Sequence, residues 1–294
     1  MANPPKPPRH LLHGRLRERS IYLLPNLFTT GALFAGFYAV VQAMNGQFEP
    51  AAIAIFIAMV LDGMDGRVAR LTRTQSAFGA EYDSLSDMVS FGVAPALVLY
   101  VWALKPMGKL GWIAAFIYCA GAALRLARFN TKLDESDKRY FQGLPSPAAA
   151  ALLAGLVWVM YENKISGADI LFDWLQVKWL AWGFTVFAGL TMVSDLRYFS
   201  GKDFNLRKSV PFVVILCIVL AFVLISYNPP EVLFTLFVAY GLSGYVGWAM
   251  RRMRGRKGEA TYSPYLPRIR RIAQPTSPDK PDATNSVHST AGGL

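Results

Sequence analysis

Charged side chains are scarce in this 294-residue chain, and their scarcity argues against an ordinary water-soluble domain. Only 17% of the residues are Asp, Glu, Lys or Arg, whereas a soluble domain carries about a quarter. Acids are the scarcer sign, 19 against 30 basic residues, and 53% of the chain is hydrophobic. A basic excess is also typical of nucleic-acid-binding proteins, but here Lys and Arg lie between and beyond apolar runs. The composition therefore predicts a membrane protein without a nucleic-acid partner.

Cysteine and histidine are also rare. Cys119 and Cys217 each lie within an apolar run, and their separation matches no disulfide framework or metal motif. We interpret both as small apolar packing residues. The three histidines, His10, His13 and His288, are all near the chain ends. We therefore expect no catalytic histidine and no covalent intermediate.

Long apolar runs, in contrast, are abundant. The first is longer than the 7–15 residues or so of a signal-peptide core, so it favours a membrane-spanning helix. About eight stretches are long enough, or nearly so, to cross a bilayer. They lie near 21–44, 50–73, 84–104, 111–130, 147–162, 175–195, 210–227 and 231–250.

The distribution of charge predicts the domain organisation and the orientation. Basic residues concentrate in alternate loops and at both ends, as the positive-inside rule requires if both termini face the cytosol. We expect a basic cytosolic tail over residues 1–20, a transmembrane catalytic domain over 21–250 and a basic, mostly disordered tail over 251–294, which has few large apolar residues beyond Gly258. Either binding to anionic lipid or simple solvation accounts for the basic patch at 268–271.

Four aspartates mark the segment from Leu61 to Ser90, LDGMDGRVARLTRTQSAFGAEYDSLSDMVS. Asp62 and Asp65 are three residues apart and Asp83 and Asp87 are four apart, so each pair shares one face of its helix. Four unpaired acids at the cytosolic ends of two spans would repel one another and lose hydration. Mg²⁺ and Mn²⁺ prefer hard oxygen ligands. The spacing therefore predicts a site for two divalent cations.

Small residues and one arginine accompany the acids. Gly66 and Ala69 follow Asp62 on the same stripe, and Gly79 precedes Asp83 by one turn. A nucleotide or diphosphate could therefore approach the backbone closely, and Arg70 is a permanent cation suited to phosphate. Gly and Ala inside membranes also serve helix packing, but packing alone does not explain their combination with four acids.

The string D-x-x-D-G-x-x-A-R, then eight residues, then G-x-x-x-D-x-x-x-D resembles the signature of the CDP-alcohol phosphotransferase family. The resemblance implies an all-α polytopic membrane protein, usually a homodimer, with a six-helix core and, here, about two further transmembrane helices. It implies that the four Asp bind two Mg²⁺ or Mn²⁺ ions and that Asp87 is also the general base. It assigns the CDP moiety to Asn26, Thr29, Gly66, Ala69, Arg70 and Gly79.

Other stretches resemble the phosphatidylserine synthase branch of that family: PNLFTTGALFAGF from Pro25, YDSLSDMVSFGVAPA from Tyr82, RLARFN from Arg125 and FQGLPSPAAA from Phe141. This resemblance implies CDP-diacylglycerol as donor and L-serine as acceptor, with attack of the serine hydroxyl at the lipid-side phosphorus and release of CMP. An enzyme of the bacterial inner membrane with a cytosolic active site is expected.

Two arginines are candidates for the acceptor site. Arg125 and Arg128 are three residues apart near the cytosolic end of the fourth span, where they could bind an acceptor carboxylate or a diphosphate. Positive-inside anchoring is the alternative. Likewise, Gly143, Pro145 and Pro147 predict either a loop over the site or a simple turn.

Three other functions remain open from the sequence. The same chemistry could use glycerol phosphate, inositol phosphate or choline as acceptor. An aspartate-rich membrane prenyltransferase would need a second Asp-rich motif, and a cation transporter would often show an internal repeat. The sequence contains neither, so both are ranked below the CDP-alcohol chemistry.

Overall fold

The computed structural model describes residues 9–72, 74–131, 140–172, 175–199 and 212–253. Each of the eight apolar stretches forms a helix or a series of joined helices. In chain order these are α1 (Arg9–Met44), α2 (Phe48–Thr72), α3 (Ala77–Asp87), α4 (Ala94–Leu99), α5 (Lys109–Thr131), α6 (Ser146–Glu162), α7 (Val177–Val193), α8 (Phe212–Tyr227) and α9 (Pro229–Met253). The π-helix η1 (Met88–Val93) joins α3 to α4, and the π-helix η2 (Tyr100–Leu104) and the 3-10 helix η3 (Lys105–Met107) continue α4, so that all five form one span, Ala77–Met107.

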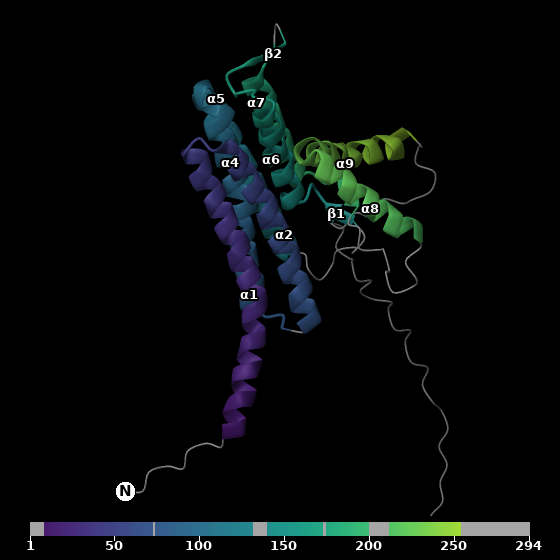
Figure 1. Cartoon of the computed structure of the whole chain (residues 1–294). Coiled ribbons are helices and arrows are strands. Elements are labelled where there is room, and N and C mark those ends of the chain that lie inside the picture. The colour runs from purple at the N-terminus through teal and green to yellow at the C-terminus, as the bar shows by residue number, and fades with distance from the viewer. Residues whose placement is uncertain (1–8, 73, 132–139, 173–174, 200–211, 254–294) are drawn as a thin grey trace, which may run out of the picture. The chain divides into compact units, whose positions relative to one another are not determined.

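Six of these spans, α1, α2, the α3–α4 span, α5, α6 and α7, run roughly alongside one another (Figure 1). Their core is rich in alanine, and Ala39, Ala43, Ala51 and Ala52 are fully buried where α1 meets α2. Small side chains let helix backbones approach closely, which is how helices associate where water provides no driving force. The bundle is therefore the six-helix core that the sequence analysis expected.

Several helices have the length and composition of membrane spans. Within the described residues, four segments are long and apolar enough to cross a bilayer, namely Pro25–Met44, Ala77–Met107, Lys109–Thr131 and Pro229–Met253, and α6 and α7 are shorter apolar helices. Large apolar side chains such as Phe34, Phe37 and Leu124 are exposed on the outside of the bundle. The predicted all-α polytopic membrane fold is confirmed.

The structure describes most of the predicted N-terminal tail and little of the predicted C-terminal tail. Helix α1 already begins at Arg9, so most of the segment predicted as an N-terminal tail is helical, although its sequence has no apolar periodicity. The C-terminal segment predicted as disordered lies, beyond Met253, outside the described residues.

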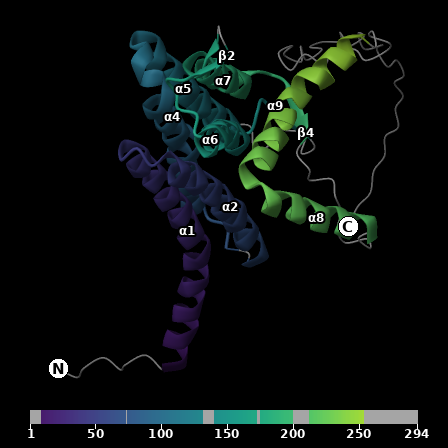
Figure 2. The same ribbon diagram turned by 45° about the horizontal axis from the view of Figure 1, so that its top comes forward.

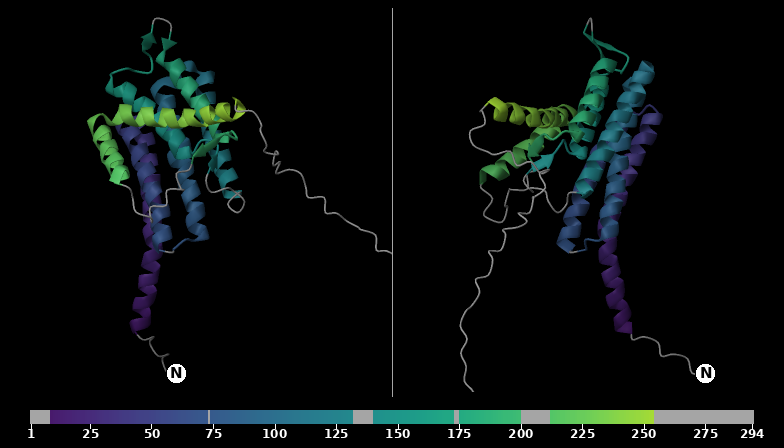
Figure 3. Two further views of the ribbon diagram at one scale, coloured as in Figure 1. Left: turned by 90° about the vertical axis from the view of Figure 1, so that its right-hand side faces the viewer. Right: turned by 180° about the vertical axis from the view of Figure 1, so that it is seen from behind.

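Helix α9 runs across the long axes of α1 and α5 rather than alongside them (Figures 2 and 3). Phe234 of α9 packs where Gly155 of α6 leaves no side chain, and Gly244 of α9 packs against the ring of Tyr198. Helix α8 precedes α9 and contacts it. These two helices are the additions to the six-helix core.

Two short antiparallel sheets link the helices. Strand β1 (Tyr140–Gln142) pairs with β4 (Arg197–Phe199), and β2 (Ile170–Phe172) pairs with β3 (Leu175–Gln176). After β1 the backbone turns at Gly143, which has φ +78° and donates its N–H to the Leu196 carbonyl at 2.8 Å. A side chain there would be strained and would overlap the Met192 carbonyl. The turn leads directly into the first residues of α6.

Candidate active site

Three of the four aspartates form one compact cluster. Asp62 comes from α2, and Asp83 and Asp87 come from α3; each offers one carboxylate oxygen within 4.8 Å of the other two. Asp62 interacts directly with Asp87, and Asp65 interacts directly with Asp83. The predicted four-acid constellation is therefore together in space, with Asp65 beside the central group of three.

The chemistry of this cluster fits a divalent cation. One carboxylate oxygen of Asp83, Oδ1, is buried without a hydrogen-bond partner in the described part of the chain. A buried acceptor without a partner is costly, and neighbouring carboxylates repel one another. A hard cation removes both costs, since carboxylate oxygens are its preferred ligands.

Helix α1 supports the cluster from one side. The Thr29 hydroxyl is buried and donates to Asp65 Oδ2 at 2.8 Å, which orients that carboxylate. The Thr29 carbonyl accepts a hydrogen bond from the Ser86 hydroxyl at 3.1 Å. Thr29 thus links α1 to both acid-bearing helices. The sequence analysis placed Thr29 with the nucleotide, and the structure places it against an acid as well.

A cavity of about 360 Å³ adjoins the acids. Asp65 and Asp83 contribute to its wall, and the Arg70 guanidinium lies 3.5 Å from where a Gly66 side chain would begin. The cavity therefore has acids in one part of its wall and a cation in another. The residues lining it include all six predicted for the CDP moiety: Asn26, Thr29, Gly66, Ala69, Arg70 and Gly79.

The start of α3 shapes the same cavity. Ser76 is the N-cap, and its hydroxyl accepts the Gly79 N–H at 3.0 Å, which is the usual way to satisfy a free donor at a helix start. A β-carbon on Gly79 would lie 3.1 Å from Ser76 Oγ and 3.6 Å from Asn26 Oδ1. Sequence reasoning missed Ser76, although a serine just before a helix is a recognisable capping signal. It also missed other lining residues: Pro25, Thr74, Gln75 and Ala80.

The two arginines of α5 have different surroundings. Arg125 is partly buried, donates to the Ser146 hydroxyl at 2.6 Å and interacts electrostatically with Asp87 and Asp62. Arg128 instead pairs with Asp195 at 3.1 Å, with side chains 31% and 88% exposed. Only Arg125 faces the acids. Ser146 and Asp195 are 21 and 67 residues away in sequence, and no sequence signal identified them.

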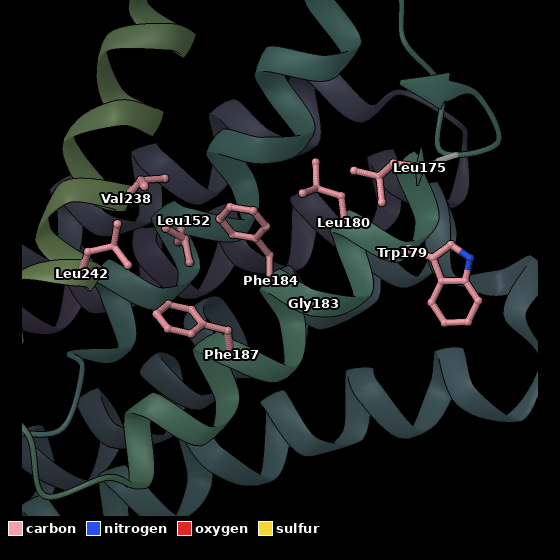
Figure 4. A pocket seen from close by; sticks show the side chains of 9 residues that line it. All are labelled: Leu152, Leu175, Trp179, Leu180, Gly183, Phe184, Phe187, Val238 and Leu242. Carbon is pink, nitrogen blue, oxygen red and sulfur yellow. The ribbon is translucent and has the colours of Figure 1, made fainter. Parts of the chain in front are cut away.

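A second cavity, of about 430 Å³, lies between α6, α7 and α9 and is unsuited to a nucleotide. None of the side chains that line it is charged, and only the Trp179 indole has a polar atom (Figure 4). A diphosphate bound there would lose its hydration without a compensating partner. The polar cavity beside the acids is therefore the candidate active site.

Known proteins resemble this chain over the region that contains the site. A profile described as CDP-alcohol phosphatidyltransferase matches residues 22–187. A CDP-diacylglycerol–serine O-phosphatidyltransferase of Helicobacter pylori (strain J99) is 39% identical over 203 residues, covering 68% of this chain and 82% of the relative. Proteins of the same name from Methanocaldococcus jannaschii and Saccharomyces cerevisiae are 41% and 35% identical, covering 49% and 45% of this chain and 61% and 52% of those relatives.

The profile match contains the entire acid motif and every predicted nucleotide contact. The nucleotide contacts line one polar cavity together with Asp65 and Asp83, and Asp83 also belongs to the cluster with Asp62 and Asp87. The chain belongs to the CDP-alcohol phosphatidyltransferase family.

Proposed function

We propose that this protein transfers the phosphatidyl group of CDP-diacylglycerol to the hydroxyl of L-serine, giving phosphatidylserine and CMP. The observation that carries the proposal is the cluster of Asp62, Asp83 and Asp87 beside a cavity that also contains Arg70. Relatives named for this reaction are 35–41% identical to the chain, and this supports serine as the acceptor.

The cavity would hold the CDP moiety. Gly66, Ala69 and Gly79 keep its wall free of bulky side chains, so a nucleotide can lie against the helix backbones. Arg70 supplies a fixed positive charge for phosphate, and the Asn26 amide supplies both donors and acceptors for a base or ribose. The two acyl chains stay in the bilayer beside the bundle.

Two divalent cations, Mg²⁺ or Mn²⁺, would be held by Asp62, Asp65, Asp83 and Asp87. Their chemistry is to neutralise the diphosphate and stabilise the charge that develops on CMP. The unpartnered oxygen of Asp83 and the two acid–acid contacts support this assignment.

Asp87 is the proposed general base. A serine hydroxyl is a weak nucleophile, and a base aligned with it contributes about 10²- to 10⁴-fold to the rate. In the proposed step the serine oxygen forms a bond to the lipid-side phosphorus, the bond from that phosphorus to CMP breaks, and the hydroxyl proton passes to an Asp87 carboxylate oxygen. Arg125 interacts electrostatically with Asp87, and this supports a proposed role in binding the serine carboxylate, with a diphosphate of the donor as the alternative.

The proposed organisation follows the charge pattern. Residues 21–250 form the transmembrane catalytic domain, with basic cytosolic tails at 1–20 and 251–294. The protein lies in the bacterial inner membrane, and its active site faces the cytosol. The enzyme is proposed to be a homodimer, as the family resemblance implies.

The test is CMP release by purified protein given CDP-diacylglycerol and Mn²⁺ or Mg²⁺, with and without L-serine. Release that requires both serine and metal, with phosphatidylserine formed, is the expected result. If CMP is released only with glycerol phosphate, inositol phosphate or choline, the proposed acceptor is wrong and the proposed active site is retained. No release with any alcohol would favour a prenyltransferase or a cation transporter.

A further inference from the structure

The helix that carries Asp83 and Asp87 changes its geometry immediately after Asp87. Residues Met88–Val93 form a π-helix, in which the Ala94 N–H bonds to the Val89 carbonyl five residues earlier. A π-helical turn is wider than an α-helical turn and is frequent at functional sites. The backbone is continuous from α3 into the π-helix, so a rotation of the π-helix about its axis would also turn the Asp87 side chain.

One face of α5 follows this π-helix toward the acids. Tyr118, Ala122 and Arg125 are four and three residues apart, so they lie on the same side of α5. The fully buried Tyr118 donates its hydroxyl to the Phe91 carbonyl, inside the π-helix, at 2.8 Å. Ala122 packs against Gly92 of the π-helix, and Arg125 interacts with Asp87. Tyr118 therefore attaches the π-helix to the helix that also carries Arg125.

The opposite side of the π-helix is attached to α1. The Ser90 hydroxyl is fully buried and donates to the Ala32 carbonyl at 3.0 Å. A β-carbon on Gly36 would lie 2.7 Å from Ser90 Cα, so the two backbones are in direct contact there. The segment after Asp87 is thus held on two sides by hydrogen bonds from a hydroxyl to a backbone carbonyl. If the segment rotated, at least one of these bonds would break and leave a buried polar group unpaired.

We propose that Tyr118 and Ser90 are positioning residues for the acid cluster: their hydroxyl groups fix the π-helix to α5 and α1, and so hold Asp87 at the separation from Asp62 that cation binding requires. Among the described residues, the Ser90 and Tyr118 hydroxyls bond backbone carbonyls rather than the acids, and both act through the backbone that follows Asp87. The inference rests on the cation site of the proposed function.

The experiment compares Mn²⁺ binding by wild-type protein, Tyr118→Phe, Ser90→Ala and the control Tyr198→Phe. Tyr198 matches Tyr118 closely, since it is also fully buried and donates its hydroxyl to a backbone carbonyl, that of Gly241, at 2.8 Å. Its bond joins β4 to α9 instead of reaching the π-helix. Binding is measured without substrate, from the loss of the free Mn²⁺ signal in electron paramagnetic resonance, and thermal unfolding without metal reports any loss of stability.

We expect the half-saturating Mn²⁺ concentration to rise about tenfold in Tyr118→Phe and in Ser90→Ala, at the lower end of what supporting groups contribute to metal sites. It stays at the wild-type value in Tyr198→Phe, even if both tyrosine variants unfold at similarly reduced temperatures. With saturating Mn²⁺ the rate of CMP release recovers in both test variants, and KM for CDP-diacylglycerol is unchanged.

Wild-type Mn²⁺ affinity in folded Tyr118→Phe and Ser90→Ala would overturn the inference and leave the proposed function intact. An equal loss of affinity in Tyr198→Phe would also overturn it, because the effect would then follow general stability. Wild-type protein that binds no Mn²⁺ would overturn the cation site itself, and the inference with it.

Discussion

At the scale of single residues, the site consists of four aspartates whose carboxylates lie next to one another. Asp62 faces Asp87 and Asp65 faces Asp83, an arrangement that is unfavourable without cations or protons between the carboxylates. Among these four, Asp87 is the candidate for proton transfer. Its role and that of the arginines can be separated by substitutions that keep side-chain size.

Replacing Asp87 with Asn removes the proposed base and keeps the shape of the side chain. We expect transfer to fall by at least about 10²-fold, the lower bound for general-base catalysis, in protein that still folds. Radioactive serine incorporation into lipid measures the rate. Asp195→Asn is the control: this side chain is 88% exposed and pairs with Arg128 at the surface, so the rate of this variant stays near that of the wild type. If the Asp87→Asn variant turns over at a near-normal rate, Asp87 is not the general base.

Arg125→Lys tests the acceptor site. The partly buried guanidinium donates to the Ser146 hydroxyl and interacts electrostatically with Asp87, and lysine cannot reproduce its planar, forked geometry. A hydrogen bond to a charged group contributes about 1.5–3 kcal/mol, so we expect KM for serine to rise about 10- to 100-fold with KM for CDP-diacylglycerol unchanged. Arg128→Lys, at the exposed ion pair, has a smaller effect on both. If KM for the lipid rises instead, Arg125 contacts the donor.

At the scale of elements, α9 is held to the bundle by close contacts at glycine. A β-carbon on Gly244 would overlap the Tyr198 ring, which is fully buried and fixed by its bond to Gly241. Three residues along, a β-carbon on Gly247 would meet only Arg251, at 3.9 Å. The same substitution therefore has opposite expected effects at two neighbouring positions.

Gly244→Ala should destabilise the docking of α9 by about 1–3 kcal/mol, as overpacking does. Gly247→Ala should be neutral or stabilise the helix by up to about 1 kcal/mol, because alanine has the higher helix propensity. Thermal unfolding and limited proteolysis in detergent measure both. A Gly244→Ala protein as stable as Gly247→Ala would mean that α9 is not packed against β4 in this way.

At the scale of the whole molecule, cation binding links helices that are separate in sequence. Asp62 belongs to α2 and Asp83 to α3, and a ligand that binds only the assembled bundle stabilises it by mass action. The same ions are proposed to serve both stability and catalysis.

Removing metal should therefore abolish CMP release and also lower the unfolding temperature. At a Mn²⁺ concentration about 100 times the dissociation constant, the stabilisation is about 2.7 kcal/mol. Chelation with EDTA followed by addition of Mn²⁺ or Mg²⁺, with activity and thermal unfolding recorded at each step, tests this. Asp62→Asn serves as the control, because its unfolding temperature should respond little to Mn²⁺. If the unfolding temperature of the wild-type protein does not change when Mn²⁺ is added, the proposed cation site is contradicted.

Much of the fold and part of the site could be predicted from local sequence. The eight apolar stretches became helices because each satisfies its own backbone hydrogen bonds, as a membrane requires. Asp62 with Asp65, and Asp83 with Asp87, lie on shared helix faces because their spacing is a property of one helix. The positions of Gly66, Ala69 and Gly79 beside these acids could be predicted from their spacing in the same way. The sequence by itself therefore determined the helical membrane fold, the family and the acids.

Only the tertiary structure decided how those helices meet. It placed Arg125 toward the acids and Arg128 against Asp195, although the two arginines are on one helix three residues apart. It brought Tyr118 to the π-helix and directed α9 across the bundle. These features depend on contacts between residues at least 21 positions apart, and side-chain periodicity within a helix contains no information about which neighbour will fill a buried space.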